Sequence, residues 1–426
     1  MPQTPESPTA IGGPCSERRQ LEDVLLACLR AESGESAAAA LERLDASGCR
    51  DLARLARRLR VAPLLGWRLR QSYIGLGDLS TRLRNQVHRT AAENLRKAGA
   101  LRAIAGAFRE AGIACVALKG AYLAEAVYRE LSVRPMSDLD LLVPLASAEA
   151  AARTLRELGY RSEAAGDDSV AAKGLKHLPE FRDESGDIVV ELHCHVTSPG
   201  EPGHIDVAEL WTRSQPVTLA GAQMLALAPE DLLLVLCAHV AYEHEFEFDL
   251  RPFCDVAQVT RCCRIDWDAV LERARRWRWE RGVYMTLRLA AEWVAAPVPA
   301  DVLQGLAPPG AHEAICETVR ARVFGRESAD EARFSHRSYL ARFWEAGSWP
   351  DRLRLAAGRL FLDRSTIGAL YGVDPSSLRI LGCYAWRLRD LLLQFAPVFK
   401  DLALGDESPR RLMRDKASIA CWLTGE

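Results

Sequence analysis

The apolar residues in the first quarter of this 426-residue chain recur at helical intervals. From about Glu17 to Glu110 the sequence is rich in Ala, Leu and Arg, and a long stretch ends before Gly112. Six apolar residues of that stretch fall near one helical face: Leu79, Leu83, Val87, Leu95, Ile104 and Phe108. We therefore expect a helical region over residues 17–110, with its arginines on a solvated face. Residues 1–16, rich in Pro, Ser, Thr and Gly, predict a disordered tail and not a signal peptide.

The pattern changes at Gly112, where short apolar runs bounded by turn residues replace the long helical spacing. The expected elements, in order, are a strand at 113–118, a helix at 121–130, a strand at 138–143, a helix at 147–159, and a hairpin with arms at 178–182 and 188–196. Pro144 ends the second strand, and residues 184–187 form the hairpin turn. This order predicts a small mixed sheet over residues 111–215.

Helical spacing returns at Pro229 and continues toward the end of the chain. We expect a helical domain over residues 216–300, packed on the sheet, and a C-terminal helical region over residues 301–426. The predicted fold class is α+β, with a small mixed-sheet core embedded in large helical N- and C-terminal regions.

Composition limits the class of protein. Apolar residues make up 49% of the chain and charged residues 26%, the balance of a soluble globular protein. The longest apolar run, Leu232 to Val240, is too short to span a membrane. The 55 basic and 57 acidic residues nearly cancel, which argues against long nucleic acid but leaves a short RNA or a single nucleotide open. Twelve scattered cysteines without a CxxC pair indicate reduced thiols and predict a cytoplasmic protein.

The first candidate site is the pair Asp138 and Asp140, which lies in an apolar strand. Residues two apart on a strand point to the same face, so the two carboxylates would repel each other. A divalent cation such as Mg²⁺ relieves that repulsion, because it favours carboxylate oxygen. In an isolated D-x-D motif, the simpler interpretation is that one aspartate caps a neighbouring element and the other faces water. The neighbouring residues decide between these interpretations.

A third carboxylate stands in the second arm of the predicted hairpin. There Val189, Glu191, His193 and His195 share one face of the strand. If this strand lies beside the strand of Asp138, three carboxylates converge. Two Mg²⁺ ions held by them would bridge the phosphates of a nucleoside triphosphate, since attack on phosphate depends on positioning and charge neutralisation.

The turn at Lys119-Gly120 supports the same chemistry. A glycine between strand and helix lets the backbone approach a phosphate, and the helix that follows directs its amides toward anions. Lys119 and Arg134 would supply positive charge to the triphosphate. Taken singly, Gly120 is an ordinary turn glycine and Lys119 a surface lysine, but the acidic residues that follow favour a phosphate site.

These residues together resemble the uncharacterised nucleotidyltransferase family of the DNA polymerase β-like superfamily. The resemblance covers about Ala111 to Pro299. It is carried by Leu118-Lys119-Gly120-Ala121, Arg134, Asp138-Leu139-Asp140-Leu141-Leu142-Val143, Glu191-Leu192-His193, Pro229-Glu230-Asp231-Leu232-Leu233, His239, His244, Asp255 and Ile265-Asp266-Trp267. Ala121 stands where the superfamily usually has Ser, so a hydroxyl contact to the phosphates is missing.

The resemblance implies Mg²⁺- or Mn²⁺-dependent transfer of a nucleoside monophosphate from an NTP such as ATP to an acceptor hydroxyl. It implies that Asp138, Asp140 and Glu191 are catalytic metal ligands, and that Glu191 also serves as the base. We assign nucleotide binding to Lys119, Gly120, Arg134, Ser137 and His193. His193 either contacts phosphate or orients Glu191, or else it is a hydrogen-bonded structural histidine.

The acceptor is left open as a small molecule, a peptide or a protein. Two alternative functions also remain: a template-independent RNA-modifying transferase, and a non-catalytic nucleotide-sensing or partner-binding protein. His239 and His244 lie five residues apart on a predicted helix, so we expect them not to share a face, and one of them to face the cleft.

Overall fold

The computed structural model describes residues 14–30, 34–71, 77–162, 176–197, 205–247, 249–310, 312–325, 348–350, single residues between 353 and 373, 376–403 and 408–425. Most of the predicted disordered tail, residues 1–13, lies outside this part of the chain. The first helix, α1, begins at Pro14, within the segment we expected to be a tail.

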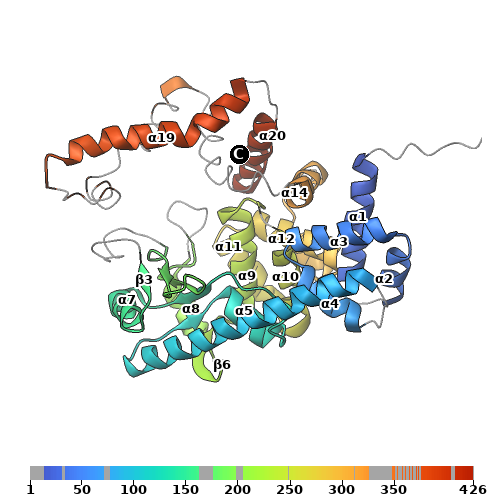
Figure 1. The fold of residues 1–426 in the computed structure, drawn as a ribbon, viewed down its shortest axis with the longest axis horizontal. Helices are drawn as coiled ribbons and strands as arrows, with labels where there is room; N and C mark the ends of the chain where they lie inside the picture. The colour runs from blue at the N-terminus through green and yellow to red at the C-terminus, as the bar shows by residue number, and fades with distance from the viewer. Residues whose placement is uncertain are drawn as a thin grey trace, which may run out of the picture.

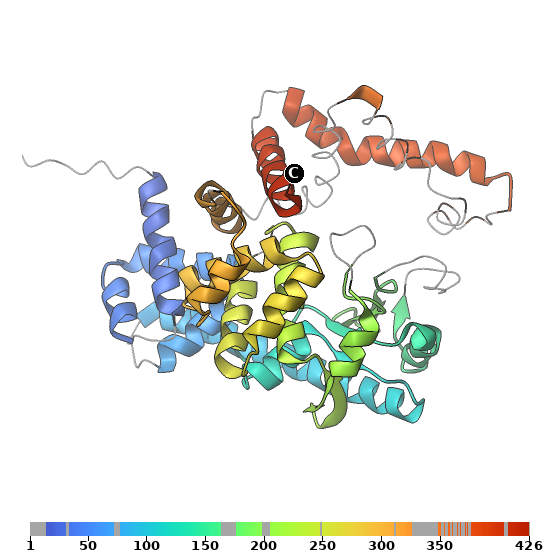
Figure 2. The same cartoon turned by 180° about the vertical axis from the view of Figure 1, so that it is seen from behind.

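The N-terminal region is helical, as predicted. Its helices are α1 (Pro14–Leu29), α2 (Gly34–Leu41), α3 (Ala46–Arg58), α4 (Ala62–Gln71) and α5 (Gly77–Glu110). Figures 1 and 2 show α5 running along one side of the molecule, from these helices to the sheet. Its first turns join one hydrophobic core through Leu79 and Leu83, and its last turns join a second core through Ile104 and Phe108. Leu95, which we placed on the same face as these residues, lies between the two cores and is 61% exposed.

A mixed sheet of seven strands forms the centre of the second core, in the order β3-β4-β5-β2-β1-β7-β6. Its strands are β1 (Val116–Ala117), β2 (Leu139–Leu142), β3 (Arg161–Ser162), β4 (Phe181–Arg182), β5 (Val189–His193), β6 (Gln215–Leu219) and β7 (Ala222–Ala226). Strand β2 pairs antiparallel to β1 and parallel to β5, and β4 and β5 form the predicted hairpin. The β6–β7 hairpin, in which β7 lies parallel to β1, extends the sheet past residue 215, where we expected the core to end.

Helices cover the sheet and continue beyond it. They are α6 (Lys119–Tyr122), the π-helical segment η1 (Leu123–Val127), the 3₁₀ turn η2 (Leu145–Ser147), α7 (Ala148–Glu157), α8 (Val207–Arg213), α9 (Pro229–Ala238), the π-helical segment η4 (His239–Glu243), α10 (Arg251–Cys262), α11 (Trp267–Arg276), α12 (Glu280–Val294), α13 (Ala300–Leu306), α14 (Glu313–Gly325), α19 (Ile380–Ala403) and α20 (Ser408–Thr424). The fold is therefore α+β with helical flanks, as predicted. Among the described helices, none is both long and apolar enough to cross a membrane.

A buried aromatic core holds the helices after the sheet together. Trp277, Trp279 and Trp293 are each 1% exposed and belong to the same hydrophobic core as the N-terminal helices. Ile419 of α20 also joins this core, whereas α19 contacts α20 and extends away from the sheet in Figures 1 and 2. The helices before and after the sheet therefore share one apolar interior.

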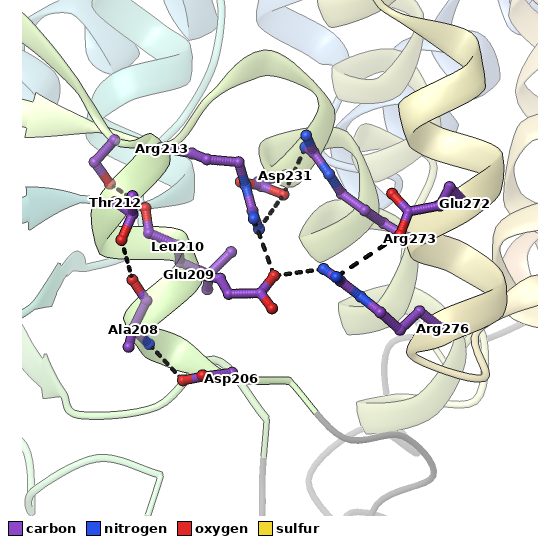
Figure 3. Close-up of polar contacts among 11 residues, drawn as sticks. Asp206, Ala208, Glu209, Leu210, Thr212, Arg213, Asp231, Glu272, Arg273 and Arg276 are labelled. Atoms are coloured by element: carbon purple, nitrogen blue, oxygen red, sulfur yellow. Dashed lines mark hydrogen bonds and ion pairs between the residues drawn. The ribbon is translucent and has the colours of Figure 1, made fainter.

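An ion-pair network joins α8 to the helices that follow the sheet (Figure 3). Its centre is Asp231 of α9, which has no exposed surface. Arg213 donates to both of its carboxylate oxygens at 2.7 and 3.2 Å, and Arg273 of α11 donates at 2.9 Å. Glu209 accepts from Arg213 and from Arg276 at the exposed edge of the network. This network fixes α9 against both neighbours, and α9 leads directly into one wall of the cavity described below.

Removal of Asp231 would leave two arginines without their buried partner. We therefore expect Asp231→Ala to lower the free energy of unfolding by about 3–5 kcal/mol, as measured by urea denaturation. The matched control is Glu272→Ala, which removes an exposed carboxylate 3.7 Å from Arg276 and should cost less than about 1 kcal/mol. Equal losses for the two variants would show that the buried pairs do not stabilise the junction.

Candidate functional site

The three predicted metal-binding carboxylates lie together at one face of the sheet. Asp140 is in β2 and Glu191 is its partner residue in the parallel strand β5, while Asp138 stands just before β2. Leu139 and Leu141 alternate with the aspartates and are completely buried on the opposite face. All three carboxylates line one cavity of about 370 Å³. The expected convergence is confirmed, because the two strands are neighbours.

His193 lies between two of these carboxylates. Its Nε2 atom is 2.9 Å from Asp140 Oδ1 and 3.2 Å from Glu191 Oε2, and its side chain is 1% exposed. Its Nδ1 atom is buried without a hydrogen-bond partner among the described residues. Of the predicted alternatives, the geometry favours a histidine that orients Glu191 and Asp140.

The environment gives the three carboxyl groups different proton affinities. Burial, and then the charges of Asp140 and Glu191, raise the pKa of Asp138 to about 6. Burial acts in the same direction on Asp140, but the charge of Lys119 and the hydrogen bond from His193 outweigh it and lower the pKa of Asp140. The hydrogen bond from His193 also lowers the pKa of Glu191. Asp138 is thus the carboxylate whose charge is least compensated by the protein.

The Lys119-Gly120 turn borders the same cavity. Lys119 has a φ of +30°, which is unusual for a residue with a side chain, and it begins α6 directly after β1. A Cβ atom at Gly120 would lie 3.0 Å from Nη1 of Arg134. A larger residue here would press against the guanidinium that packs on this backbone, so the close contact favours glycine.

Arg134 is held by a carboxylate of the helical domain. Its Nε and Nη2 atoms donate to Asp255 of α10 at 3.3 and 2.9 Å, and both side chains are less than a tenth exposed. This two-point pair ties the segment before β2 to α10. Arg134 and Ser137 both line the cavity. The guanidinium of Arg134, to which we assigned nucleotide binding, donates to Asp255.

The cavity is also lined by residues for which the sequence predicted no role: Arg60, Lys176, His177, Glu243 and Arg251. The wall formed by η4 contains Glu243 together with His239 and His244. The expectation that His239 and His244 do not share a face is wrong. They are brought together by η4, since a π-helix bonds residue i to residue i+5 and places residues five apart near one another. Their ring centroids are 4.6 Å apart, and both rings face the cavity.

Polar contacts connect this wall through Glu243. Lys176 donates to Glu243 Oε1 at 2.5 Å, and Glu243 Oε2 is 2.9 Å from His239 Nδ1. Lys119 Nζ is 3.1 Å from the same nitrogen. Burial, and then the charge of Lys119, lower the pKa of His239 to about 3, and burial lowers that of His244 to about 4. Both rings are therefore neutral at pH 7, and the positive charge next to them comes from Lys119 and Lys176.

Within the part of the chain that the structure describes, two groups of side chains have the donor atoms and spacing to hold a metal ion. They are Asp140, Glu191 and His193 on the sheet, and His239, Glu243 and His244 on η4, each with ligand atoms within 4.8 Å of one another. The second group is in contact with Lys119 and Lys176, whose positive charges oppose a cation. The first group has the carboxylate of Asp138 beside it in the same cavity, and this adds negative charge. Charge therefore favours the sheet group for a metal and the η4 wall for anions.

The different pKa values of Asp138 and Asp140 predict opposite effects of their removal. Because folding raises the pKa of Asp138, ionising this group costs stability as the pH rises toward 6 and above. Because folding lowers the pKa of Asp140, its charge contributes stability at every pH above its unfolded value near 4. We expect Asp138→Asn to raise the melting temperature by a few degrees at pH 8 and by less at pH 5.

Asp140→Asn should lower the melting temperature at both pH 5 and pH 8. Thermal unfolding followed by circular dichroism at the two pH values measures both variants. A lower melting temperature for Asp138→Asn at pH 8 would contradict the assignment of uncompensated charge to this residue.

A comparison with protein families agrees with this geometry. The model of the family described as uncharacterised nucleotidyltransferase matches residues 45–295. No curated protein matches the chain, and neither does a solved structure. The family match covers more than half of the chain and begins just before α3, well ahead of the resemblance seen in the sequence. The chain belongs to this uncharacterised nucleotidyltransferase family.

Proposed function

We propose that this member of the uncharacterised nucleotidyltransferase family transfers a nucleoside monophosphate from an NTP to the hydroxyl of an acceptor. The observation that carries the proposal is the pairing of Asp140 with Glu191 on adjacent strands, with Asp138 beside them. In the reaction, the acceptor oxygen forms a bond to the α-phosphorus and the bond to the β-phosphate oxygen breaks. Pyrophosphate leaves with the electron pair of that bond.

The sheet carboxylates fit a divalent cation. Their oxygens are the ligands that Mg²⁺ and Mn²⁺ prefer. Burial, and then the charges of Asp140 and Glu191, raise the pKa of Asp138, and a cation would offset both effects. Asp138, Asp140 and Glu191 would hold the metal, and His193 would orient the last two. When bound, the metal supplies charge neutralisation for the phosphates and activation of the attacking hydroxyl.

The opposite wall supplies the charges for the triphosphate. In the structure, Lys119 contacts His239 and Lys176 donates to Glu243. Phosphate oxygens would replace these contacts with charge-assisted hydrogen bonds. The amides at the start of α6, at the Lys119-Gly120 turn, would add backbone donors for the phosphates. Arg134 is assigned a positioning role, because it fixes β2 to α10 through Asp255.

We assign Glu191 as the base that accepts the proton of the acceptor hydroxyl. A fifth of its side chain is exposed, against 7% for Asp140, so it is the more accessible of the two paired carboxylates. Its hydrogen bond to His193 lowers its pKa and keeps it ionised, and thus able to accept a proton, at neutral pH.

We expect an NTP to raise the melting temperature only when Mg²⁺ or Mn²⁺ is present, because the carboxylates and the phosphates repel each other without a cation. Thermal shift assays with ATP, GTP, CTP and UTP, with and without EDTA, measure this. Asp140→Asn should abolish the metal-dependent part of the shift. An equal shift in EDTA would favour the nucleotide-sensing alternative over an enzyme.

Incubation with each α-³²P-labelled NTP and a cell extract tests the transfer itself. We expect label to enter an acceptor from the α-position and not from a γ-labelled NTP. Asp138→Asn and Glu191→Gln should each reduce labelling by at least 100-fold, since both remove a metal ligand. The matched control is Asp187→Asn. Asp187 is an exposed carboxylate on the same hairpin as Glu191, and it pairs with Arg96 of α5, so this variant should label normally. Normal labelling by all variants would refute the metal assignment.

A further inference from the structure

A second cavity lies between α3 and α5, and its walls are dominated by arginine. It has a volume of about 200 Å³ and is lined by Arg50, Arg54 and Arg57 of α3, by Arg82 of α5, and by Ala53, Leu83, Asn85 and Gln86. We call this cavity the arginine groove. The four arginines are exposed, and Asp51 pairs with Arg54 at its edge. A bound anion would reduce the repulsion among the guanidinium groups that line the groove.

The charge around the groove is local, and the composition of the whole chain conceals it. Residues 43–89 contain 11 arginines, no lysine and only three acidic residues, in a chain whose formal net charge is −2. Arginine presents a planar fork that matches phosphate oxygens in a way that lysine does not. A phosphate-bearing ligand is therefore the chemistry that this surface favours.

The groove leads toward the catalytic cavity along α3 and the turn that follows it. Arg50, Arg54 and Arg57 follow one face of α3 at intervals of four and three residues, and with a rise of about 1.5 Å per residue they span roughly 10 Å. Arg60, which lies just past the end of α3 with a φ of +55°, lines the catalytic cavity. Arg58 does not belong to this line, because it donates to the carbonyl oxygen of Phe324.

We propose that the acceptor is the end of a single-stranded RNA, whose phosphates lie along the arginine groove and whose terminal hydroxyl reaches the catalytic cavity. A regular line of charges fits a polymer with one phosphate per unit, and the same polymer carries the hydroxyl that the reaction needs. None of the residues that line the groove is aromatic, so the contacts are to the backbone and do not select a base sequence. Transfer to the RNA end rests on the proposed function, whereas binding of RNA by the arginine groove does not.

Binding is measured without NTP or metal, by fluorescence anisotropy of a 5′-labelled 12-nucleotide oligo(U) at several salt concentrations. The triple variant R50A/R54A/R57A should weaken binding at least ten-fold. It should also make the slope of log K against log salt concentration shallower by about 2, because each of three phosphate contacts on a single strand contributes about 0.7. The matched control R102A/R109A/R153A removes three exposed arginines from the far end of α5 and from α7, and should bind like the unmodified protein. Circular dichroism checks that both triple variants remain folded.

Three results would overturn the proposal: no binding of the oligonucleotide, equal binding by the two triple variants, or equally effective competition by polyglutamate of the same length. The last result would indicate an acidic protein partner. Labelling with α-³²P-NTP then tests the reaction on the bound RNA, and a 3′-deoxy end should abolish it. RNA that binds through the groove but is not labelled would refute the proposed transfer to RNA and leave the groove assignment intact.

Discussion

Electrostatic repulsion among Asp138, Asp140 and Glu191 is the constraint on which the rest of the site depends. The parallel pairing of β2 with β5 makes Asp140 and Glu191 neighbours, and the strand period adds Asp138. The protein compensates this charge unequally. His193 and Lys119 stabilise the ionised form of Asp140, whereas the pKa of Asp138 rises to about 6. A site that keeps one carboxylate uncompensated is suited to a cation that arrives with its substrate.

The other half of the cavity depends on how the helical domain is fixed to the sheet. Asp231 holds α9 through two arginines, and Asp255 holds α10 through Arg134. Between these helices, η4 directs His239, Glu243 and His244 into the cavity and holds two lysines against them. Buried ion pairs thus fix the helices on either side of η4, one to its neighbouring helices and the other to the segment before β2.

Much of this could be predicted from the sequence, because local patterns govern it. Alternation around Asp140 and Glu191 predicted both the face and the strand, and the resemblance predicted the family. The partners of Arg134 and the convergence of the η4 residues could not be predicted, because they depend on tertiary contacts and on a π-helical turn that has no clear sequence signal. The arginine groove was missed for a different reason: net charge is an average, and here a basic segment is balanced by acidic residues elsewhere.

The central claim is that the three sheet carboxylates hold the metal and that the η4 wall does not. Crystals grown with Mn²⁺ and a non-hydrolysable NTP analogue test it through the anomalous scattering of manganese. We expect an anomalous peak between Asp138, Asp140 and Glu191, with the triphosphate directed toward Lys119 and Lys176. A peak at His239, Glu243 and His244, with none at the carboxylates, would contradict it.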